Sequence, residues 1–153
     1  MLRGAKTWVA TLVALIGLAF FAPLSVAASP SEPITVVTQG VITGPTSVAG
    51  TFTLSGPFSD SGTYVESFRI EGLSIRGVKT ISGSRGTATL VVTAVLRWTS
   101  PTTAELDAGH WRLSSGTGDY KGLLGGGSPG GAGSASLATG QVQVVHSGFV
   151  SAG

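Results

Sequence analysis

The chain has 153 residues, of which 24 are Gly, none is Cys and 10% are charged. That length suits one domain, and the absence of Cys excludes a disulfide framework, thiolate catalysis and zinc or iron–sulfur sites built on Cys. Two of the nine basic residues, Arg3 and Lys6, lie at the N-terminus, so the remainder has as many basic as acidic residues, seven of each. Because these basic residues are also spread singly, we expect no nucleic-acid partner.

The N-terminus has the pattern of a secretory signal peptide. Two basic residues precede an uncharged apolar run at about residues 8–22, and small residues follow, with Ser25-Val26-Ala27 fitting a cleavage site. We therefore expect residues 1–27 to be removed and residues 28–153 to form a single exported domain, secreted or periplasmic. An uncleaved membrane anchor is the alternative, but the apolar run is short for a bilayer span, so we expect no stable membrane anchor after cleavage.

The rest of the chain predicts strands rather than helices. No stretch repeats apolar residues at helical spacing, and Thr, Val, Ser and Gly dominate between closely spaced turn signals. Eight strands are expected, at residues 34–43, 48–54, 63–71, 73–81, 87–99, 108–115, 134–139 and 141–149, with turns at 59–62 and 82–86. Sequential antiparallel pairing favours an all-β, eight-stranded up-and-down barrel of the calycin-like type, with a β-sandwich as the alternative. An outer-membrane barrel is disfavoured because aromatic girdles are lacking.

A glycine-rich segment follows the sixth predicted strand, at residues 116–133. Its residues 126–130 match the G-x-S-x-G pattern of hydrolases by letter. Pro129 has no N–H to offer to an oxyanion hole, so we interpret these residues as a flexible loop. Residues 116–122 lack the spacing of a phosphate-binding loop and are expected to form a tight bend, with Tyr120 packed against the barrel.

The strand at residues 87–99 shows the clearest alternation. Its apolar face consists of Ala88, Leu90, Val92, Ala94, Leu96 and Trp98. The apolar face of a strand in a small barrel lines the interior, which is either packed or holds one small ligand. We expect a small apolar ligand in a cavity lined by Tyr64, Phe68, Leu90, Leu96, Trp98 and Trp111.

The two histidines, His110 and His146, do not predict a catalytic or a metal site. His110 lies on the face of its strand opposite Trp111 and Leu113, so we interpret it as solvent-facing. A Ser-His-Asp arrangement with Asp107 is formally available in any serine-rich chain and carries little weight. Two histidines without an acidic pattern make a poor metal site, and we predict no metal and no cofactor.

Glu66 interrupts the apolar face of the strand predicted at residues 63–71. If Tyr64, Phe68 and Ile70 face the interior, alternation places Glu66 there too. A buried carboxyl costs several kcal/mol unless it is paired or protonated, and it could act as a general acid or base or bind a polar ligand atom. A bulge or a shifted register would instead place Glu66 in water beside an arginine, and this second position is the one we favour. Glu66 is the candidate catalytic residue.

The stretch SGTGDYKGLLGGG, from Ser115 to Gly127, resembles the G-T-G-x-[YF]-x-G-x-x-G-x-G segment of dirigent and allene oxide cyclase-like barrels. The order of parts is also similar, from the exported leader to the two closing strands. The resemblance implies an eight-stranded antiparallel barrel with an apolar cavity, often in a homo-oligomer. It also implies two chemistries, the closure of an unsaturated fatty-acid epoxide to a cyclopentenone and the steering of phenoxy-radical coupling. Glu66 is the position that matches the interior Glu of the cyclases, whereas the Asn and Cys that they also use are absent from this chain.

These patterns favour an exported small β-barrel protein that holds a small apolar ligand and is not an enzyme. Two alternatives stay open. One is an isomerase or cyclase of the allene oxide cyclase or dirigent type that uses an interior Glu. The other is a structural surface protein whose barrel is fully packed.

Overall fold

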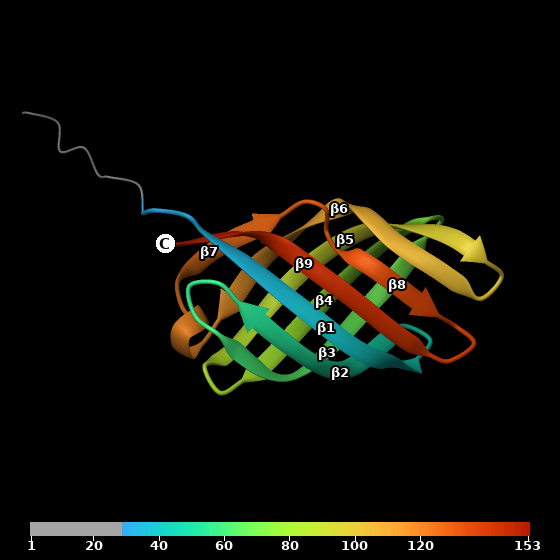
Figure 1. Ribbon diagram of the computed structural model, residues 1–153, viewed down its shortest axis with the longest axis horizontal. Helices are drawn as coiled ribbons and strands as arrows, with labels where there is room; N and C mark the ends of the chain where they lie inside the picture. The colour runs from blue at the N-terminus through green and yellow to red at the C-terminus, as the bar shows by residue number, and fades with distance from the viewer. Residues whose placement is uncertain (1–28) are drawn as a thin grey trace, which may run out of the picture.

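Strands form nearly all of the structure, a computed structural model that describes residues 29–153 (Figure 1). Nine strands and one 3-10 helix lie in this range: β1 (Glu32–Gly44), β2 (Ser47–Ser55), β3 (Asp60–Glu71), β4 (Ser74–Gly83), β5 (Gly86–Ser100), β6 (Thr103–Gly116), η1 (Gly118–Tyr120), β7 (Leu123–Gly127), β8 (Ala132–Ser136) and β9 (Gln141–Ala152). The signal peptide predicted for residues 1–27 lies outside the described residues. In residues 29–153, no helix is long and apolar enough to cross a membrane.

Antiparallel hydrogen bonding closes these strands into a barrel. Each strand from β1 to β6 pairs with the next one along the chain, and β1 also pairs with β9, from Glu32 opposite Val150 to Val41 opposite Gln141. Figure 1 shows β1 and β9 side by side across the front of the barrel. Closure satisfies backbone groups that would be unpaired at the edges of an open sheet. The predicted all-β barrel is thereby confirmed, and the β-sandwich alternative is wrong.

Two short strands share the barrel position between β6 and β9. β7 pairs with β6 at Trp111 and Arg112, while β8 pairs with β6 over residues 103–106, and both also pair with β9. Eight positions are thus filled, as predicted, but by nine strands. The flexible loop predicted at residues 126–130 was wrong for Gly126 and Gly127, which belong to β7. Strand pairing uses backbone N–H and C=O groups, which glycine supplies as well as any other residue.

The connections between the strands gather at two ends of the barrel. We call the end with the β1–β2, β3–β4, β5–β6 and β8–β9 connections the mouth end, on the right in Figure 1. The closed end, on the left, has the β2–β3, β4–β5 and β6–β7 connections, the last of which contains η1. The turn predicted at residues 59–62 was wrong from Asp60 onward, because Asp60 already belongs to β3 and pairs with Leu54 of β2.

Tyr120 covers the interior at the closed end. Its side chain is buried and packs edge-on against Phe58, with 5.1 Å between the ring centroids. Gly118 and Gly122 flank it with φ angles of 57° and 77°, a backbone conformation that glycine adopts without strain. The expected tight bend with Tyr120 packed against the barrel is confirmed.

Asp60 fastens Tyr120 and the β4–β5 connection to β3. Its Oδ2 accepts hydrogen bonds from the Tyr120 hydroxyl at 2.8 Å and from the Arg85 N–H. Its Oδ1 accepts from the Ser61 N–H and from both the N–H and the hydroxyl of Ser84. Burial alone would raise the pKa of Asp60, but the hydrogen bond from Tyr120 and those from the other donors lower it overall.

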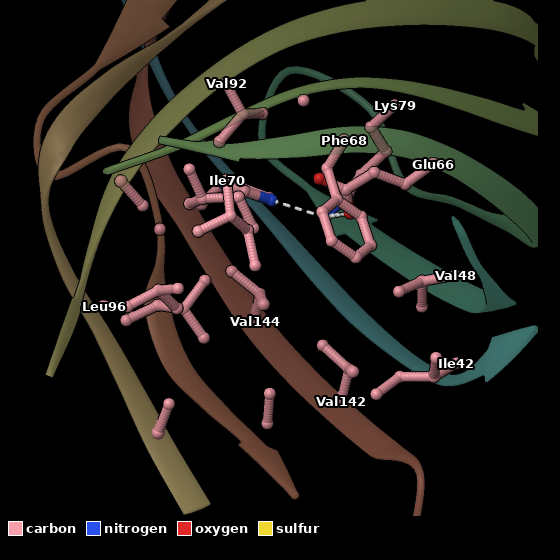
Figure 2. Close-up of a pocket in the computed structure, with 18 of the residues that line it drawn as sticks. Ile42, Val48, Glu66, Phe68, Ile70, Lys79, Val92, Leu96, Val142 and Val144 are labelled. Atoms are coloured by element: carbon pink, nitrogen blue, oxygen red, sulfur yellow. Dashed lines mark hydrogen bonds and ion pairs between the residues drawn. The ribbon is translucent and has the colours of Figure 1, made fainter. Parts of the chain in front are cut away.

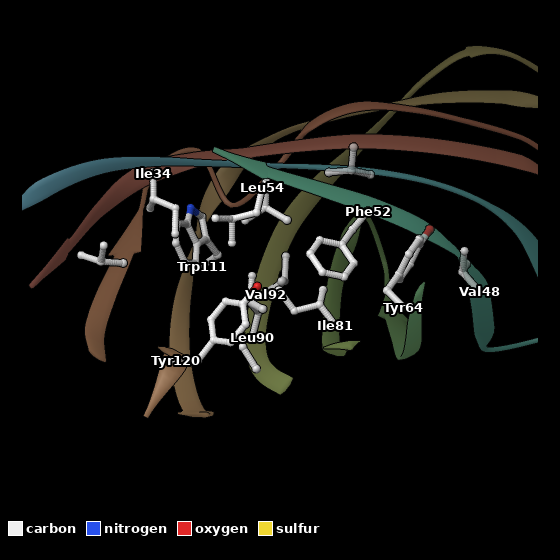
Figure 3. Close-up of a cluster of buried hydrophobic side chains, with 14 of the residues drawn as sticks. Ile34, Val48, Phe52, Leu54, Tyr64, Ile81, Leu90, Val92, Trp111 and Tyr120 are labelled. Atoms are coloured by element: carbon white, nitrogen blue, oxygen red, sulfur yellow. The ribbon is translucent and has the colours of Figure 1, made fainter. Parts of the chain in front are cut away.

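The interior consists of a packed closed half and a hollow open half. The closed half is filled by large buried side chains (Figure 3), including Ile34, Phe52, Leu54, Ile81, Leu90, Trp111 and Tyr120. The space left among its side chains amounts to about 10 Å³. The open half, toward the mouth end, encloses the cavity described below.

Candidate ligand-binding cavity

The open half of the barrel encloses a cavity of about 90 Å³ (Figure 2). Apolar side chains from eight strands form most of its wall, among them Ile42, Val48, Phe68, Val92, Leu96, Val142 and Val144. The labelled aliphatic side chains of β1, β5 and β9 point toward a common space in Figure 2. Three ionisable side chains lie among the lining residues, those of Glu66, Lys79 and His146.

The cavity meets solvent at the mouth end. Ile70, Trp98 and Leu137 line it and are 51%, 47% and 56% exposed. They come from three different strand ends or connections, so together they form an apolar rim rather than a single exposed hairpin. An apolar molecule could therefore enter without first displacing the packed closed half.

Lys79 of β4 forms the polar floor of the cavity together with three neighbours. Its side chain is only 1% exposed, and its Nζ lies 2.8 Å from Nε2 of His146, 3.2 Å from Oγ1 of Thr38 and 3.2 Å from Oε2 of Glu66. An ammonium has three N–H donors, so these three acceptors match it in number. Burial lowers the pKa of Lys79, and the negative charge of Glu66 opposes that shift.

His146 of β9 is held as a neutral acceptor. Its Nδ1 contacts the carbonyl oxygen of Gly130, an acceptor only, so Nδ1 carries the proton and Nε2 is free to accept from Lys79. Burial, followed by the positive charge of Lys79, lowers the pKa of His146 to about 3. In residues 29–153 no group of three or more acidic or histidine side chains is placed to hold a metal ion.

Glu66 lies inside the barrel, and the solvent position favoured above was wrong. β3 and β4 pair in regular register without a bulge, with Glu66 opposite Lys79, so alternation holds and the carboxylate faces inward. The side chain is 12% exposed, and its partner is a lysine rather than an arginine. Oε1 of Glu66 lies 2.5 Å from the position that a Cβ atom on residue 77 would take. The glycine at position 77 therefore leaves room for the carboxylate.

Tyr64 adds an unpaired hydroxyl next to this floor. Among the described residues, its hydroxyl is the buried side-chain polar atom that has no hydrogen-bond partner. Its ring lies 5.1 Å from Nζ of Lys79, within the range of a cation–π contact. Burial and then the charge of Glu66 raise the pKa of Tyr64 to about 12, which keeps the phenol neutral.

The structure divides the predicted ligand-binding residues between the two halves. Phe68, Leu96 and Trp98 line the cavity, as does Glu66. Leu90 and Trp111 belong to the packed closed half, and Tyr64 packs beside the floor without lining the cavity. Alternation identifies inward side chains correctly but does not tell at which depth the interior is hollow.

Sequence reasoning missed Lys79 and His146. Both could have been found by the alternation that pointed to Glu66, because Lys79 shares a strand face with Ile75 and Ile81, and His146 shares one with Val144. His110, by contrast, is exposed as predicted, and its ring contacts the Thr93 hydroxyl on the outside of the barrel.

Comparisons with protein-family models, with curated proteins and with solved structures gave no match. The resemblance to dirigent and allene oxide cyclase-like barrels stays a prediction from the glycine-rich stretch. The function has to be inferred from the cavity and its polar floor.

Proposed function

We propose that the protein binds a small apolar molecule in the open half of its barrel, with one polar atom of the ligand near Glu66 and Lys79. The observation that carries the proposal is the cavity, which is apolar on its walls, open at the mouth end and polar at its floor. Such a combination of an apolar pocket with a few convergent polar groups is typical of small-molecule sites. The cavity also favours binding over the fully packed structural barrel.

The size of the cavity favours a slender ligand. A dry apolar cavity of about 150 Å³ is sufficient for benzene, whereas this one has about 90 Å³. A ring would not fit without displacing wall residues, but an unbranched alkyl chain could enter end-on. The remainder of such a chain would lie along Trp98 and Leu137 at the rim.

Tryptophan fluorescence tests this proposal, because the two barrel tryptophans lie in different halves. Trp98 is at the rim of the cavity and Trp111 is buried in the closed half. We expect 1-octanol to shift Trp98 emission saturably to shorter wavelength, because the alkyl chain shields the half-exposed indole from water, and 1-adamantanol, which is bulky, to have little effect. Absence of a saturable shift with octanol, or a shift that persists unchanged in Trp98→Phe, would contradict the proposal.

A matched pair of variants on β5 locates the binding site. Ala94 lines the cavity, and Ala94→Ile fills part of it. Val95 is the next residue and faces outward, so Val95→Ile adds a methylene group on the other side of the same strand. We expect octanol binding to be lost in Ala94→Ile and retained in Val95→Ile; equal affinity of both variants would place the ligand elsewhere.

A second candidate is an isomerase or cyclase that uses Glu66 as a general acid or base. The position of the Glu66 carboxylate among the cavity-lining residues favours it. For any substrate that is turned over, we expect Glu66→Gln to lose turnover while the variant still folds and binds octanol. Retained turnover in Glu66→Gln would remove this residue from the mechanism.

Export is part of the proposal. We infer that residues 1–27 are cleaved and that the barrel acts in a secreted or periplasmic setting, on the strength of the leader sequence. The intact mass of the protein recovered from outside the cytoplasm would show the loss of these residues, and an uncleaved mass would contradict it.

A further inference from the structure

Lys79 places a primary amine at the bottom of an apolar cavity. The chain has two lysines in the described range, Lys79 and Lys121, and Lys121 is exposed. A buried ion pair such as Lys79–Glu66 is weak evidence of a contribution to stability, because apolar residues of similar size often serve the fold as well or better. The position of this amine therefore calls for a chemical role.

We propose that Lys79 holds an unbranched apolar aldehyde as a Schiff base in the cavity, with Glu66 as the counter-ion of the iminium. This inference rests on the proposed function and names the ligand class. The aldehyde carbon would lie at the floor, within reach of Nζ, and its alkyl chain would extend toward the apolar rim.

The surroundings of Lys79 favour a neutral carbonyl over a carboxylate. The Lys79 charge is already balanced by Glu66 at 3.2 Å, and the three N–H donors of the amine already have acceptors. A fatty-acid carboxylate would bring a second negative charge beside Glu66 without an unpaired cation to receive it. An aldehyde is uncharged, and its reaction transfers the lysine charge to an iminium that keeps the same partner.

The reaction balances with the groups present. Glu66 takes one proton from the Lys79 ammonium, and the Nζ lone pair then forms a bond to the carbonyl carbon. A proton moves from nitrogen to oxygen to give a carbinolamine. Glu66 returns its proton to the carbinolamine hydroxyl, which leaves as water as the C=N bond forms. The products are a protonated imine, the Glu66 carboxylate and one water molecule.

His146 and Thr38 have positioning roles in this scheme. His146 accepts from Nζ through Nε2, with its ring fixed by the Gly130 carbonyl, and Thr38 accepts through Oγ1 while donating to the carbonyl oxygen of Val144. These contacts fix the direction of the amine. Burial lowers the pKa of Lys79, which increases the share of neutral amine available for attack.

Reductive trapping with octanal and sodium cyanoborohydride tests the proposal, with Lys121 as an internal control. Peptide mapping should show one octyl group on Lys79, formed saturably and at least about tenfold faster than on Lys121, since binding places the aldehyde beside the amine. Glyoxylate, a charged aldehyde, should modify Lys121 and spare Lys79. Lys121→Met should leave octylation of Lys79 unchanged, and sodium octanoate should not compete with octanal.

The outcomes separate the two proposals. Octylation of Lys121 alone, or equal rates at both lysines, overturns the Schiff base; if 1-octanol still shifts Trp98 emission, apolar binding stands by itself. Failure of both octanal trapping and the octanol-induced emission shift overturns the proposed function as well. Strong competition by octanoate would contradict the choice of a carbonyl ligand. Replacement of Glu66 by Gln should slow trapping at Lys79 and not at Lys121; equal trapping in this variant would remove Glu66 from the reaction.

Discussion

The closed half and the open half of the barrel each enclose a carboxylate, and they stabilise it in different ways. At the closed end, Asp60 accepts five hydrogen bonds from backbone and hydroxyl donors of β3, the β4–β5 connection and η1. In the open half, the polar partner of Glu66 is the ammonium group of another side chain, Lys79. The first arrangement ties connections together, whereas the second leaves an amine and a carboxylate beside a cavity.

The packing around the two carboxylates also differs between the halves. About 10 Å³ is left in the closed half, and about 90 Å³ in the open half. Interiors are normally packed without voids larger than a water molecule, so the hollow space beside the buried ion pair is where we propose that a ligand binds. The comparison predicts that changes in the closed half affect stability and that changes in the open half affect ligand binding.

The largest effect is expected from Asp60→Ala. This change leaves the buried Tyr120 hydroxyl and several N–H groups without an acceptor, so the free energy of unfolding should fall by about 4 kcal/mol. Urea denaturation measures it. Asp119→Ala is the matched control at the same end, because the Asp119–Arg85 pair is about half exposed and should contribute no more than about 1 kcal/mol. Equal losses in both variants would show that Asp60 does not secure the closed end.

Two leucines on the same face of β5 allow a direct comparison of how each half contributes to stability. Leu90 is packed in the closed half, and Leu90→Ala should cost about 3 kcal/mol through lost burial and a new void. Leu96 lies on the cavity wall, where one side already lacks contacts, so Leu96→Ala should cost roughly half as much. Urea midpoints measured with an unchanged m-value give both numbers. A larger loss in Leu96→Ala would contradict the assignment of the hollow half.

As the pH falls, the open half should lose stability before the closed end does. Burial and then the charge of Lys79 lower the pKa of His146 to about 3, from 6.5, so between these values the unfolded chain binds a proton that the folded barrel does not. Stability should then fall with decreasing pH by about 1.4 kcal/mol per unit in that window. The pKa of Asp60 is also lowered, but Asp60 is an acid. Its contribution to stability is therefore fully present above its ordinary pKa of 3.8 and is lost only as the pH falls below that value.

Urea denaturation at a series of pH values checks this order, with the two histidines as matched sites. His146→Gln should remove the slope between pH 6.5 and 3, whereas His110→Gln, on the exposed surface, should leave it in place. A slope that survives in His146→Gln would assign the acid sensitivity to another group.

The fold could be predicted from the sequence because its strands alternate clearly. On β5, Ala88 through Leu96 face inward at every second position, and the same rule places Tyr64, Glu66 and Phe68 on one face of β3. β7 was not predicted, since its run of glycines carries no alternation. The structure gives the physical reason for those glycines: a Cβ on Gly127 would lie 2.0 Å from the carbonyl oxygen of Ser147 and 2.7 Å from the Trp111 indole nitrogen.

The site was only partly predictable, because its chemistry depends on pairing across strands. Glu66 was identified, but its position depended on register, and Lys79 was treated as one of several scattered basic residues. Only the pairing of β3 with β4 shows that the two are opposite each other. His146 comes from β9, which reaches this floor because β9 pairs with β1 beside Thr38 and closes the barrel.

Replacing both Lys79 and Glu66 is expected to have the smallest effect on stability and the largest effect on ligand chemistry. Lys79→Met alone leaves the Glu66 charge unpaired and should be destabilising, as should Glu66→Met alone for the opposite reason. With both replaced, the floor no longer contains a charged side chain, and the free energy of unfolding should return to within about 1 kcal/mol of the unchanged protein. Urea denaturation of the two single variants and the double variant measures this cycle.

The double variant should still bind 1-octanol but should give no octanal adduct at position 79. If the double variant were instead as unstable as Asp60→Ala, the ion pair would be a structural element like the closed end, and the contrast between the halves would fail.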